Sequence, residues 1–173
     1  LPNYLGDDFN LPMVDVSGSM STYRISDNLT CMDVAVSLGL YLSDKQKGRF
    51  KNLVLTFSSN PKLVELKGTL KQKHAQLLDC DWGMSTNIEA AFIKVLDMAT
   101  THNIPASEMP KYITILSDME FNSASSVNLT AFDMIKHNYQ AYGYEMPKIV
   151  FWNLNARSGN FPVKQNEQGV SLI

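Results

Sequence analysis

Three oxygen-bearing side chains alternate in the stretch Val-Asp-Val-Ser-Gly-Ser-Met, at Asp15, Ser17 and Ser19. They follow directly on the apolar residues Leu-Pro-Met-Val, so residues 11–16 are predicted to form a buried strand that ends at these side chains. Hydroxyls and a carboxylate at a strand end could serve as nucleophiles, hold a phosphate group, cap a helix or bind a metal ion. The rest of the chain has to decide among these roles.

Two further polar groups follow predicted elements in a similar way. Asp118 ends the apolar stretch Tyr-Ile-Thr-Ile-Leu-Ser-Asp, and Ser85 and Thr86 stand just before a predicted helix over 87–100. In sheets of alternating strands and helices, ligands bind beyond the carboxyl ends of the strands, where the strand order reverses. We therefore expect five side chains to converge there from three loops, namely Asp15, Ser17, Ser19, Thr86 and Asp118.

The composition of this cluster favours a metal ion over the other roles. It holds hydroxyls and carboxylates but no lysine, arginine, cysteine or histidine, so a serine nucleophile would have no visible base. The three histidines fall in predicted helices or at their ends, where we expect surface positions: His74, His102 and His137. The glycine-rich phosphate motifs GxxxxGK and GxGxxG do not occur in the loop. Oxygen ligands of this kind suit Mg²⁺ or Mn²⁺, and Gly18 is expected to let the loop bend so that both serines face one point.

The elements that must position these residues alternate between strand and helix. Strands are predicted at 11–16, 50–59, 62–68, 111–118 and 148–155, with a last one starting in 170–173, and helices at 28–44, 69–80, 87–100 and 127–142. This order predicts an α/β fold, a doubly wound, Rossmann-like three-layer sandwich with a mostly parallel sheet of about six strands. The strand at 62–68, after the Asn60–Pro61 turn, is expected at an antiparallel edge, and the strand at 111–117 beside that at 11–16. Asp27 or Asn28 is expected to cap the helix at 28–44.

Length and charge limit the classes of protein. The 173 residues fit a single domain over 1–173, and a net charge of −2 gives no electrostatic case for binding nucleic acid or a membrane surface. No apolar run reaches the 18 residues of a membrane span. Cys31 and Cys80 lack metal-ligand spacing, so we expect free thiols and an intracellular (cytoplasmic) protein. A chain that begins at Leu1 and stops in an apolar run is expected to be a fragment of a longer protein.

At this point three segments resemble one known family. Asp-Val-Ser-Gly-Ser-Met resembles the DxSxS motif of von Willebrand factor type A domains, while Gly-Met-Ser-Thr-Asn-Ile-Glu-Ala-Ala-Phe and Tyr-Ile-Thr-Ile-Leu-Ser-Asp-Met-Glu-Phe resemble their second and third elements. In that family these elements form a metal-ion-dependent adhesion site, and the resemblance covers roughly residues 11–155. It implies that Ser17 and Ser19 bind the ion directly, Thr86 directly or through water, and Asp15 and Asp118 mostly through water.

The sequence also departs from the family pattern. Gly83-Met84-Ser85-Thr86 replaces the usual Gly-Gly-Thr or Gly-Thr, so Ser85 could take the place of Thr86, and Met119 replaces the usual glycine after the third-element aspartate. Each ligand candidate also has a purely local role open to it, as a helix cap or a turn former. The amino-acid sequence of these segments is similar to that of intracellular, uncharacterised A domains and, more distantly, to that of the Ro/TROVE ribonucleoprotein family.

The resemblance implies a function in binding. We expect a protein-interaction module whose Mg²⁺ or Mn²⁺ completes its coordination with an acidic group of a protein partner, and no enzymatic activity. Two alternatives stay open: a metal-dependent phosphoester hydrolase, in which a metal-bound water attacks, and the A domain of a ribonucleoprotein-like protein. Direct binding of nucleic acid by this chain is not expected, because it has neither a basic patch nor a stripe of aromatic residues.

Overall fold

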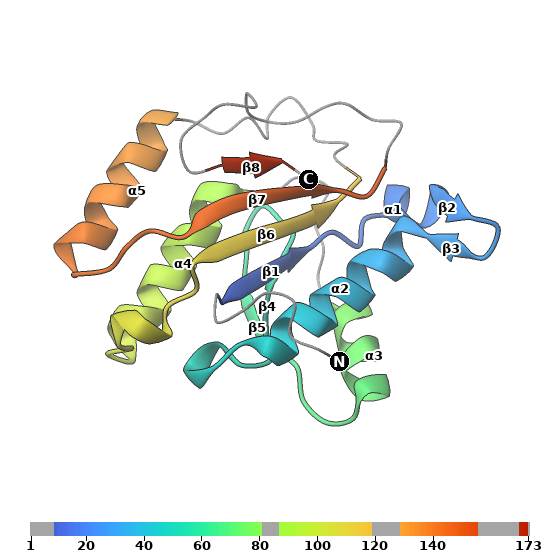
Figure 1. The fold of residues 1–173 in the computed structure, drawn as a ribbon, viewed down its shortest axis with the longest axis horizontal. Helices are drawn as coiled ribbons and strands as arrows, with labels where there is room; N and C mark the ends of the chain where they lie inside the picture. Colours follow the sequence, from blue (N-terminus) through green and yellow to red (C-terminus); the bar gives the residue numbers. More distant parts are fainter. Residues whose placement is uncertain (1–8, 81–86, 119–128, 156–169, 173) are drawn as a thin grey trace.

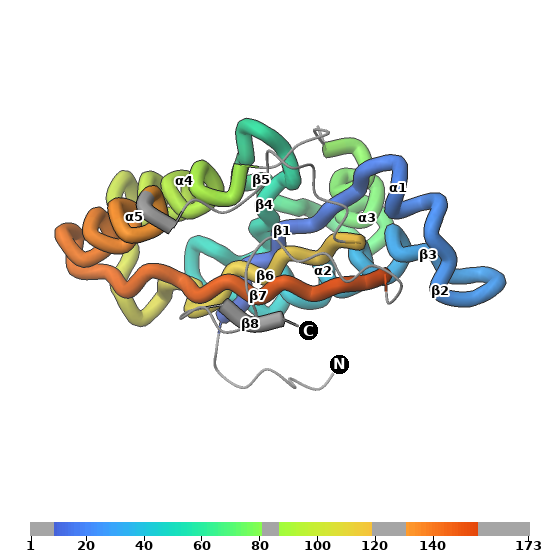
Figure 2. Tube along the Cα trace, turned by 90° about the horizontal axis from the view of Figure 1, so that it is seen from above, coloured from blue at the N-terminus to red at the C-terminus, as the bar shows by residue number. Residues whose placement is uncertain are grey.

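Six strands form one central sheet in the part of the chain that the computed structural model describes, which is residues 9–80, 87–118, 129–155 and 170–172. The order across the sheet is β5-β4-β1-β6-β7-β8, and Figures 1 and 2 both show it. All neighbours pair in parallel except β5, which pairs antiparallel with β4. The bounds are β1 (Asn10–Val14), β4 (Leu53–Thr56), β5 (Leu63–Glu65), β6 (Tyr112–Ser117), β7 (Lys148–Asn153) and β8 (Val170–Leu172).

Helices cover both faces of this sheet. Helices α2 (Cys31–Lys45) and α3 (Leu70–Leu78) share one buried cluster with the sheet, and α4 (Ile88–Thr101) and α5 (Leu129–Ala141) share the other. Alternate strand residues face opposite sides, so Leu55 belongs to the α4 side and Val54 to the α2 side. Two short 3-10 helices, Gly48–Phe50 and Ala106–Glu108, lie between the elements. The predicted α/β fold, a three-layer sandwich with an antiparallel edge strand, is confirmed.

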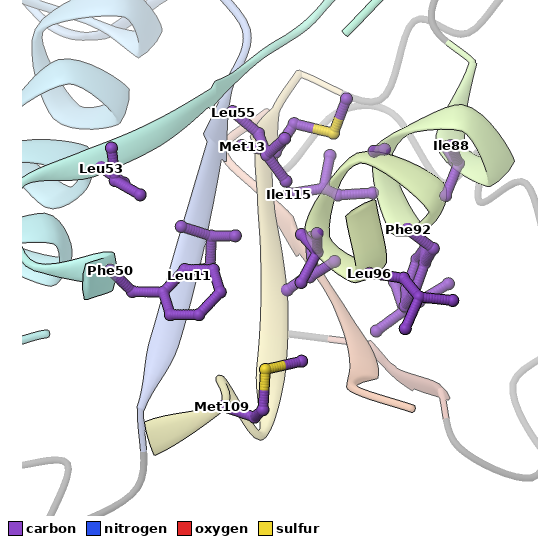
Figure 3. Close-up of a cluster of buried hydrophobic side chains, with 14 of the residues drawn as sticks. Leu11, Met13, Phe50, Leu53, Leu55, Ile88, Phe92, Leu96, Met109 and Ile115 are labelled. Carbon is purple, nitrogen blue, oxygen red and sulfur yellow. The ribbon is translucent and has the colours of Figure 1, made fainter. Parts of the chain in front are cut away.

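Helix α4 packs its apolar face on the middle of the sheet, against β1 and β6. Its buried residues recur with the predicted spacing of one helical face: Ile88, Ala91, Phe92, Val95, Leu96 and Ala99. Figure 3 shows Ile88, Phe92 and Leu96 on α4 in the same apolar cluster as Met13 and Ile115 of the sheet. On β1 and β6, Met13 pairs with Ile115 and Val14 with Leu116. The strands that end at Asp15 and Asp118 are therefore direct neighbours, as predicted.

The start of α2 differs from the prediction. The helix begins at Cys31, and its N-cap is Thr30, whose hydroxyl accepts a hydrogen bond from the Asp33 N–H while the Asp33 carboxylate accepts from the Thr30 N–H. This reciprocal box satisfies two backbone donors that a cap at Asp27 or Asn28 would not reach. The residues predicted to open the helix instead belong to a hairpin, β2 (Arg24–Ser26) and β3 (Leu29–Thr30), that forms a separate two-stranded sheet.

Two of the strands are shorter than predicted. The first strand stops at Val14 rather than at residue 16, and a short helix that the sequence did not indicate, α1 (Gly18–Thr22), follows it. The strand expected over 50–59 occupies only 53–56, because Phe50 belongs to a 3-10 helix and is buried against the α4 side of the sheet. None of the described helices is long and apolar enough to cross a membrane.

Candidate metal site at the carboxyl edge of the sheet

Asp15 follows the last residue of β1, and its carboxylate is held at both oxygens. Its backbone N–H continues the pairing with β6 by donating to the Leu116 carbonyl oxygen at 2.9 Å. Its Oδ1 atom accepts from the Ser17 N–H at 2.9 Å, and its Oδ2 atom accepts from the Ser117 hydroxyl at 2.7 Å. The side chain is 3% exposed. Asp15 therefore does form a turn with Ser17. The same hydrogen bonds hold its carboxylate next to the segment that carries Ser17 and Ser19.

Ser17 and Ser19 bring their hydroxyl oxygens within 3.1 Å of each other. Ser17 stands at the N-cap position of α1, yet its side chain makes no capping hydrogen bond, so its hydroxyl is not used in the way a cap would use it. Gly18, expected to permit a sharp bend, is the first residue of α1, and a Cβ there would meet no atom within 4 Å. The two serines converge because α1 begins between them, and the expectation about Gly18 is wrong.

Asp118 follows β6 and lies in the same buried region, with a side chain that is 1% exposed. Its N–H donates to the sulfur of Met20 at 3.1 Å, and Met20, which is completely buried, belongs to α1. This contact ties the serine-bearing helix to the end of β6. Two carboxylates and two hydroxyls thus come together from the carboxyl ends of two neighbouring parallel strands.

The electrostatics of this region disfavour two negative charges. Burial raises the pKa of the Asp15 carboxyl, hydrogen bonds from Ser117 and Ser17 oppose this shift, and the negative charge of Asp118 adds to it. The Cys31 thiol also has a raised pKa, first from burial and then from the charge of Asp118. A cation among these oxygens would offset both the desolvation and the repulsion.

Three residues that the sequence did not single out complete the surroundings. Ser117 positions Asp15, Met20 contacts Asp118, and Cys31 donates from its sulfur to the Leu154 carbonyl oxygen at 3.3 Å, at the end of β7. Of these three, only Ser117 could have been predicted from the sequence. It ends the apolar strand Ile-Thr-Ile-Leu-Ser, and a buried hydroxyl needs a hydrogen-bond partner.

The second element of the resemblance falls partly outside the described residues, and this includes Thr86 and its alternative Ser85. The residue after them is described: the Asn87 N–H donates to the Ser58 carbonyl oxygen at 3.0 Å, next to the end of β4. Asn87 also caps α4, since its side chain accepts from the Ala90 N–H at 2.9 Å. The N-cap of α4 is therefore Asn87.

The remaining metal-binding and basic groups lie elsewhere. His74, His102 and His137 are all exposed, on α3, at the end of α4 and on α5, as expected. Among the residues that the structure describes, no three His, Cys, Asp or Glu side chains gather as a metal cluster. A cation here would depend on hydroxyl oxygens beside the two carboxylates.

Comparisons with known proteins place the chain in context. A family model described as "Domain of unknown function (DUF7788)" matches residues 10–173. The uncharacterized protein L728 of Acanthamoeba polyphaga mimivirus is 32% identical over 164 residues, which cover 93% of this chain and 27% of the viral protein. The crystal structure of the Deinococcus radiodurans Ro (RSR) protein matches with a TM-score of 0.62 and 16% identity, over 96% of this chain and 31% of that one.

The structural similarity concerns the fold, because the identity is low. It supports the von Willebrand factor A-like, Ro-like fold that the sequence motifs indicate. The chain spans less than a third of the length of either protein.

Proposed function

This chain belongs to the DUF7788 family and has a von Willebrand factor A-like, Ro-like fold, and from this premise we propose that it is a divalent-cation-dependent protein-binding module. The proposal rests on one observation above all. The hydroxyls of Ser17 and Ser19 lie 3.1 Å apart, and the Ser17 hydroxyl makes no capping bond to α1. The buried Asp15 carboxylate accepts from the Ser17 N–H, and the charge of the buried Asp118 carboxylate acts on it.

This donor set fits Mg²⁺ or Mn²⁺. Both ions prefer oxygen ligands, and a site of hydroxyls and carboxylates without nitrogen or sulfur matches that preference. Both oxygens of Asp15 already accept hydrogen bonds, from Ser17 and Ser117, which suits a carboxylate that acts through water rather than as a direct ligand. Ser17 and Ser19 would hold the ion, Asp15 and Asp118 would balance its charge, and Thr86 is the proposed fifth member.

The proposed activity is the capture of a carboxylate from a protein partner. An ion held chiefly by neutral hydroxyls keeps enough positive charge to attract one further acidic group, and this is the chemistry that it would supply. The chain's own residues position that group: Ser17 stands at the N-cap of α1, Ser19 lies within α1, and Met20 fixes α1 against the end of β6. A fixed position of α1 would lower the entropic cost of binding.

Thermal unfolding tests the proposal. A ligand at about 100 times its Kd stabilises the folded state by about 2.7 kcal/mol, which corresponds to a rise in Tm of roughly 5–11 °C for a chain of this size. We expect Mg²⁺ or Mn²⁺ to produce such a rise in the wild-type protein, and Asp15→Ala or Ser17→Ala to abolish it. Calorimetric titration of Mn²⁺ gives the Kd directly.

Matched variants control for the substitutions themselves. Asp44→Ala and Ser107→Ala make the same chemical changes at exposed positions on α2 and in the second 3-10 helix, and both should keep the full rise in Tm. Equal rises in the wild type, Asp15→Ala and Ser17→Ala would place the cation elsewhere and remove the proposal.

A second candidate function rests on the similarity to the Ro protein. It makes this chain the A-like domain of a longer, ribonucleoprotein-like protein, whose RNA-binding residues would lie outside this chain because the chain itself carries a net charge of −2. Gel-shift titration with structured RNA at 0.1 M salt tests whether this chain itself binds RNA; a shift would contradict both candidates. We expect no shift with this chain alone. The hydrolase alternative predicts Mn²⁺-dependent turnover of p-nitrophenyl phosphate, and we expect none.

A further inference from the structure

A pocket of about 630 Å³ lies at the amino edge of the central sheet, opposite the edge that carries the proposed cation site. Its lining includes Phe9 before β1, Lys111 and Tyr112 at the start of β6, and Lys148 at the start of β7. In Figure 1 these three strands begin on the left and run to the right, towards α1. Strand β6 has six residues at about 3.3 Å each, so the two edges lie roughly 20 Å apart.

Strand pairing brings these lining residues together. Tyr112 pairs with Asn10 on one side and with Lys148 on the other. The Lys111 N–H donates to the Phe9 carbonyl oxygen, and the Lys148 N–H donates to the Lys111 carbonyl oxygen, both at 2.9 Å. The backbone that carries both lysines is therefore held by hydrogen bonds to its neighbours at one edge of the sheet.

The apolar part of the lining belongs to the core. Met109 is 5% exposed and is a member of the buried cluster on the α4 side, and Met146 packs against the same cluster. Pro110 is buried as well, and Tyr112 adds a half-buried aromatic ring. A ligand with an aromatic or aliphatic body would gain here by removing this apolar surface from water.

Three lysines make the lining positively charged. Lys47, which follows α2, holds its ammonium nitrogen 5.4 Å from the centre of the Phe9 ring, and Lys111 and Lys148 come from the sheet. Among the described residues of the lining Glu145 is the one acid, so the lining has a formal charge of +2 in a chain whose net charge is −2. This concentration of positive charge selects an anionic ligand.

We propose that this pocket, called the lysine pocket below, binds a small organic phosphate, with the phosphate group beside the three lysines and the organic part on the apolar lining. Lysine commonly binds phosphate as a point charge, whereas a planar carboxylate is usually held by the two parallel hydrogen bonds of arginine. The described part of the lining contains no arginine. The volume also fits, because small-molecule pockets typically measure about 300–1,000 Å³. The inference does not depend on the proposed cation.

A membrane surface or a nucleic acid matches these features less well. Segments that bind anionic lipid typically carry a cluster of about four to eight basic residues, and nucleic-acid-binding domains spread basic residues along a whole face. In the lysine pocket three lysines stand around a hollow that is also lined by methionine and aromatic side chains. This combination favours a small ligand with both a charged and an apolar part.

Calorimetric titration in EDTA tests the inference with three compounds, AMP, UMP and phenyl phosphate, and with inorganic phosphate for comparison. EDTA removes any divalent cation at the carboxyl edge, so the lysine pocket is tested alone. We expect at least one organic phosphate to bind about tenfold more tightly than inorganic phosphate, because its organic part buries apolar area. Lys111→Gln and Lys148→Gln should each weaken the binding of that compound by about tenfold, since each removes a charge-assisted hydrogen bond.

Matched variants control for the loss of charge. Lys71→Gln on α3 and Lys94→Gln on α4 make the same change at exposed positions outside the lining, and both should bind as the wild type does. Lys111 and Lys148 are exposed too, so all four variants should keep the Tm of the free protein.

Methionine methyl signals in NMR spectra show where the ligand lies. With carbon-13-labelled methyl groups, the signals of Met109 and Met146 should shift on binding because both residues line the pocket. The signal of Met20, which belongs to α1 at the other edge of the sheet, should stay in place.

Several outcomes would overturn the lysine pocket. These are no binding of any of the three compounds, inorganic phosphate binding as tightly as all of them, unchanged affinity in Lys111→Gln and Lys148→Gln, or equal losses in Lys71→Gln and Lys94→Gln. Vesicles of equal parts phosphatidylcholine and phosphatidylserine provide the last comparison. Capture of the wild type by these vesicles that both pocket variants weaken would assign the lysines to a membrane surface instead. The Mn²⁺ titration that tests the proposed function is independent of all these results.

Discussion

Ser117 shows how a single residue outside the metal motif can decide the geometry of the site. Its hydroxyl donates to Asp15 Oδ2 at 2.7 Å from the neighbouring strand, and its side chain is 1% exposed. The orientation of the Asp15 carboxylate therefore depends on the pairing of β1 with β6 as much as on the serine loop. Substituting residues that orient a metal ligand typically lowers metal affinity by about 10–100-fold.

We predict that Ser117→Ala weakens Mn²⁺ binding by roughly tenfold, a loss typical of such supporting residues. Removing a buried hydrogen-bond donor also destabilises the fold by about 1–2 kcal/mol. Calorimetric titration measures the first effect and chemical denaturation in EDTA the second.

Ser43→Ala is the matched control for this change. Ser43 is equally buried, and its hydroxyl donates to the Leu40 carbonyl oxygen on α2. This variant should lose stability to a similar degree and bind Mn²⁺ as the wild type does. A Ser117→Ala variant with unchanged Mn²⁺ affinity would show that the position of Asp15 does not depend on this hydrogen bond.

At the scale of elements, α2 packs closely on β1 at the residue that precedes Asp15. Gly39 of α2 faces β1, and a Cβ at this position would lie 2.5 Å from Cγ2 of Val14, the residue before Asp15. Valine cannot turn away easily, because its branched Cβ restricts χ1. The close approach of helix and strand thus requires a residue without a side chain at position 39.

We predict that Gly39→Ala destabilises the protein although alanine is the better helix former. Crowding in a packed core costs about 1–3 kcal/mol, while the higher helix propensity of alanine returns at most about 1 kcal/mol. Urea denaturation should therefore show a net loss. In a Val14→Ala background the loss should shrink, since the obstructing methyl group is gone. Ser37→Ala, on the exposed face of α2, should be nearly neutral.

At the scale of the whole molecule, the two cysteines differ in how deeply the fold buries them. Both are free, with Cys31 buried at the start of α2 and Cys80 partly exposed after α3. Burial raises the pKa of both thiols, so neither is activated towards alkylation in the folded state.

We predict that alkylation without reductant modifies both cysteines once the protein is denatured. Under native conditions Cys80 should react first, and Cys31 should react only as fast as the structure opens, because its sulfur is buried and donates to Leu154. Mass spectrometry over time distinguishes the two sites. Equal native rates would mean that α2 opens locally, and an intact disulfide would refute the expectation of free thiols.

The sequence by itself determined the elements whose signal is local. The apolar runs that become β1, β4, β6 and β7, the helical spacing of α4 and the polar residues at the strand ends all follow from side-chain chemistry and period. These signals sufficed for the fold class, for the neighbouring positions of β1 and β6, and for Asp15, Ser17, Ser19 and Asp118 as one candidate site. Thr86 was predicted with them and lies outside the described residues.

Only the tertiary structure decided how these parts meet. The residues 24–30 have no distinctive period, and they form a hairpin instead of a first helical turn because Thr30 and Asp33 cap α2 reciprocally. Ser117 reaches Asp15 across 102 positions of the chain, through a strand pairing that no local pattern specifies. Contacts of this kind depend on which surfaces are buried together, and burial is a property of the folded chain as a whole.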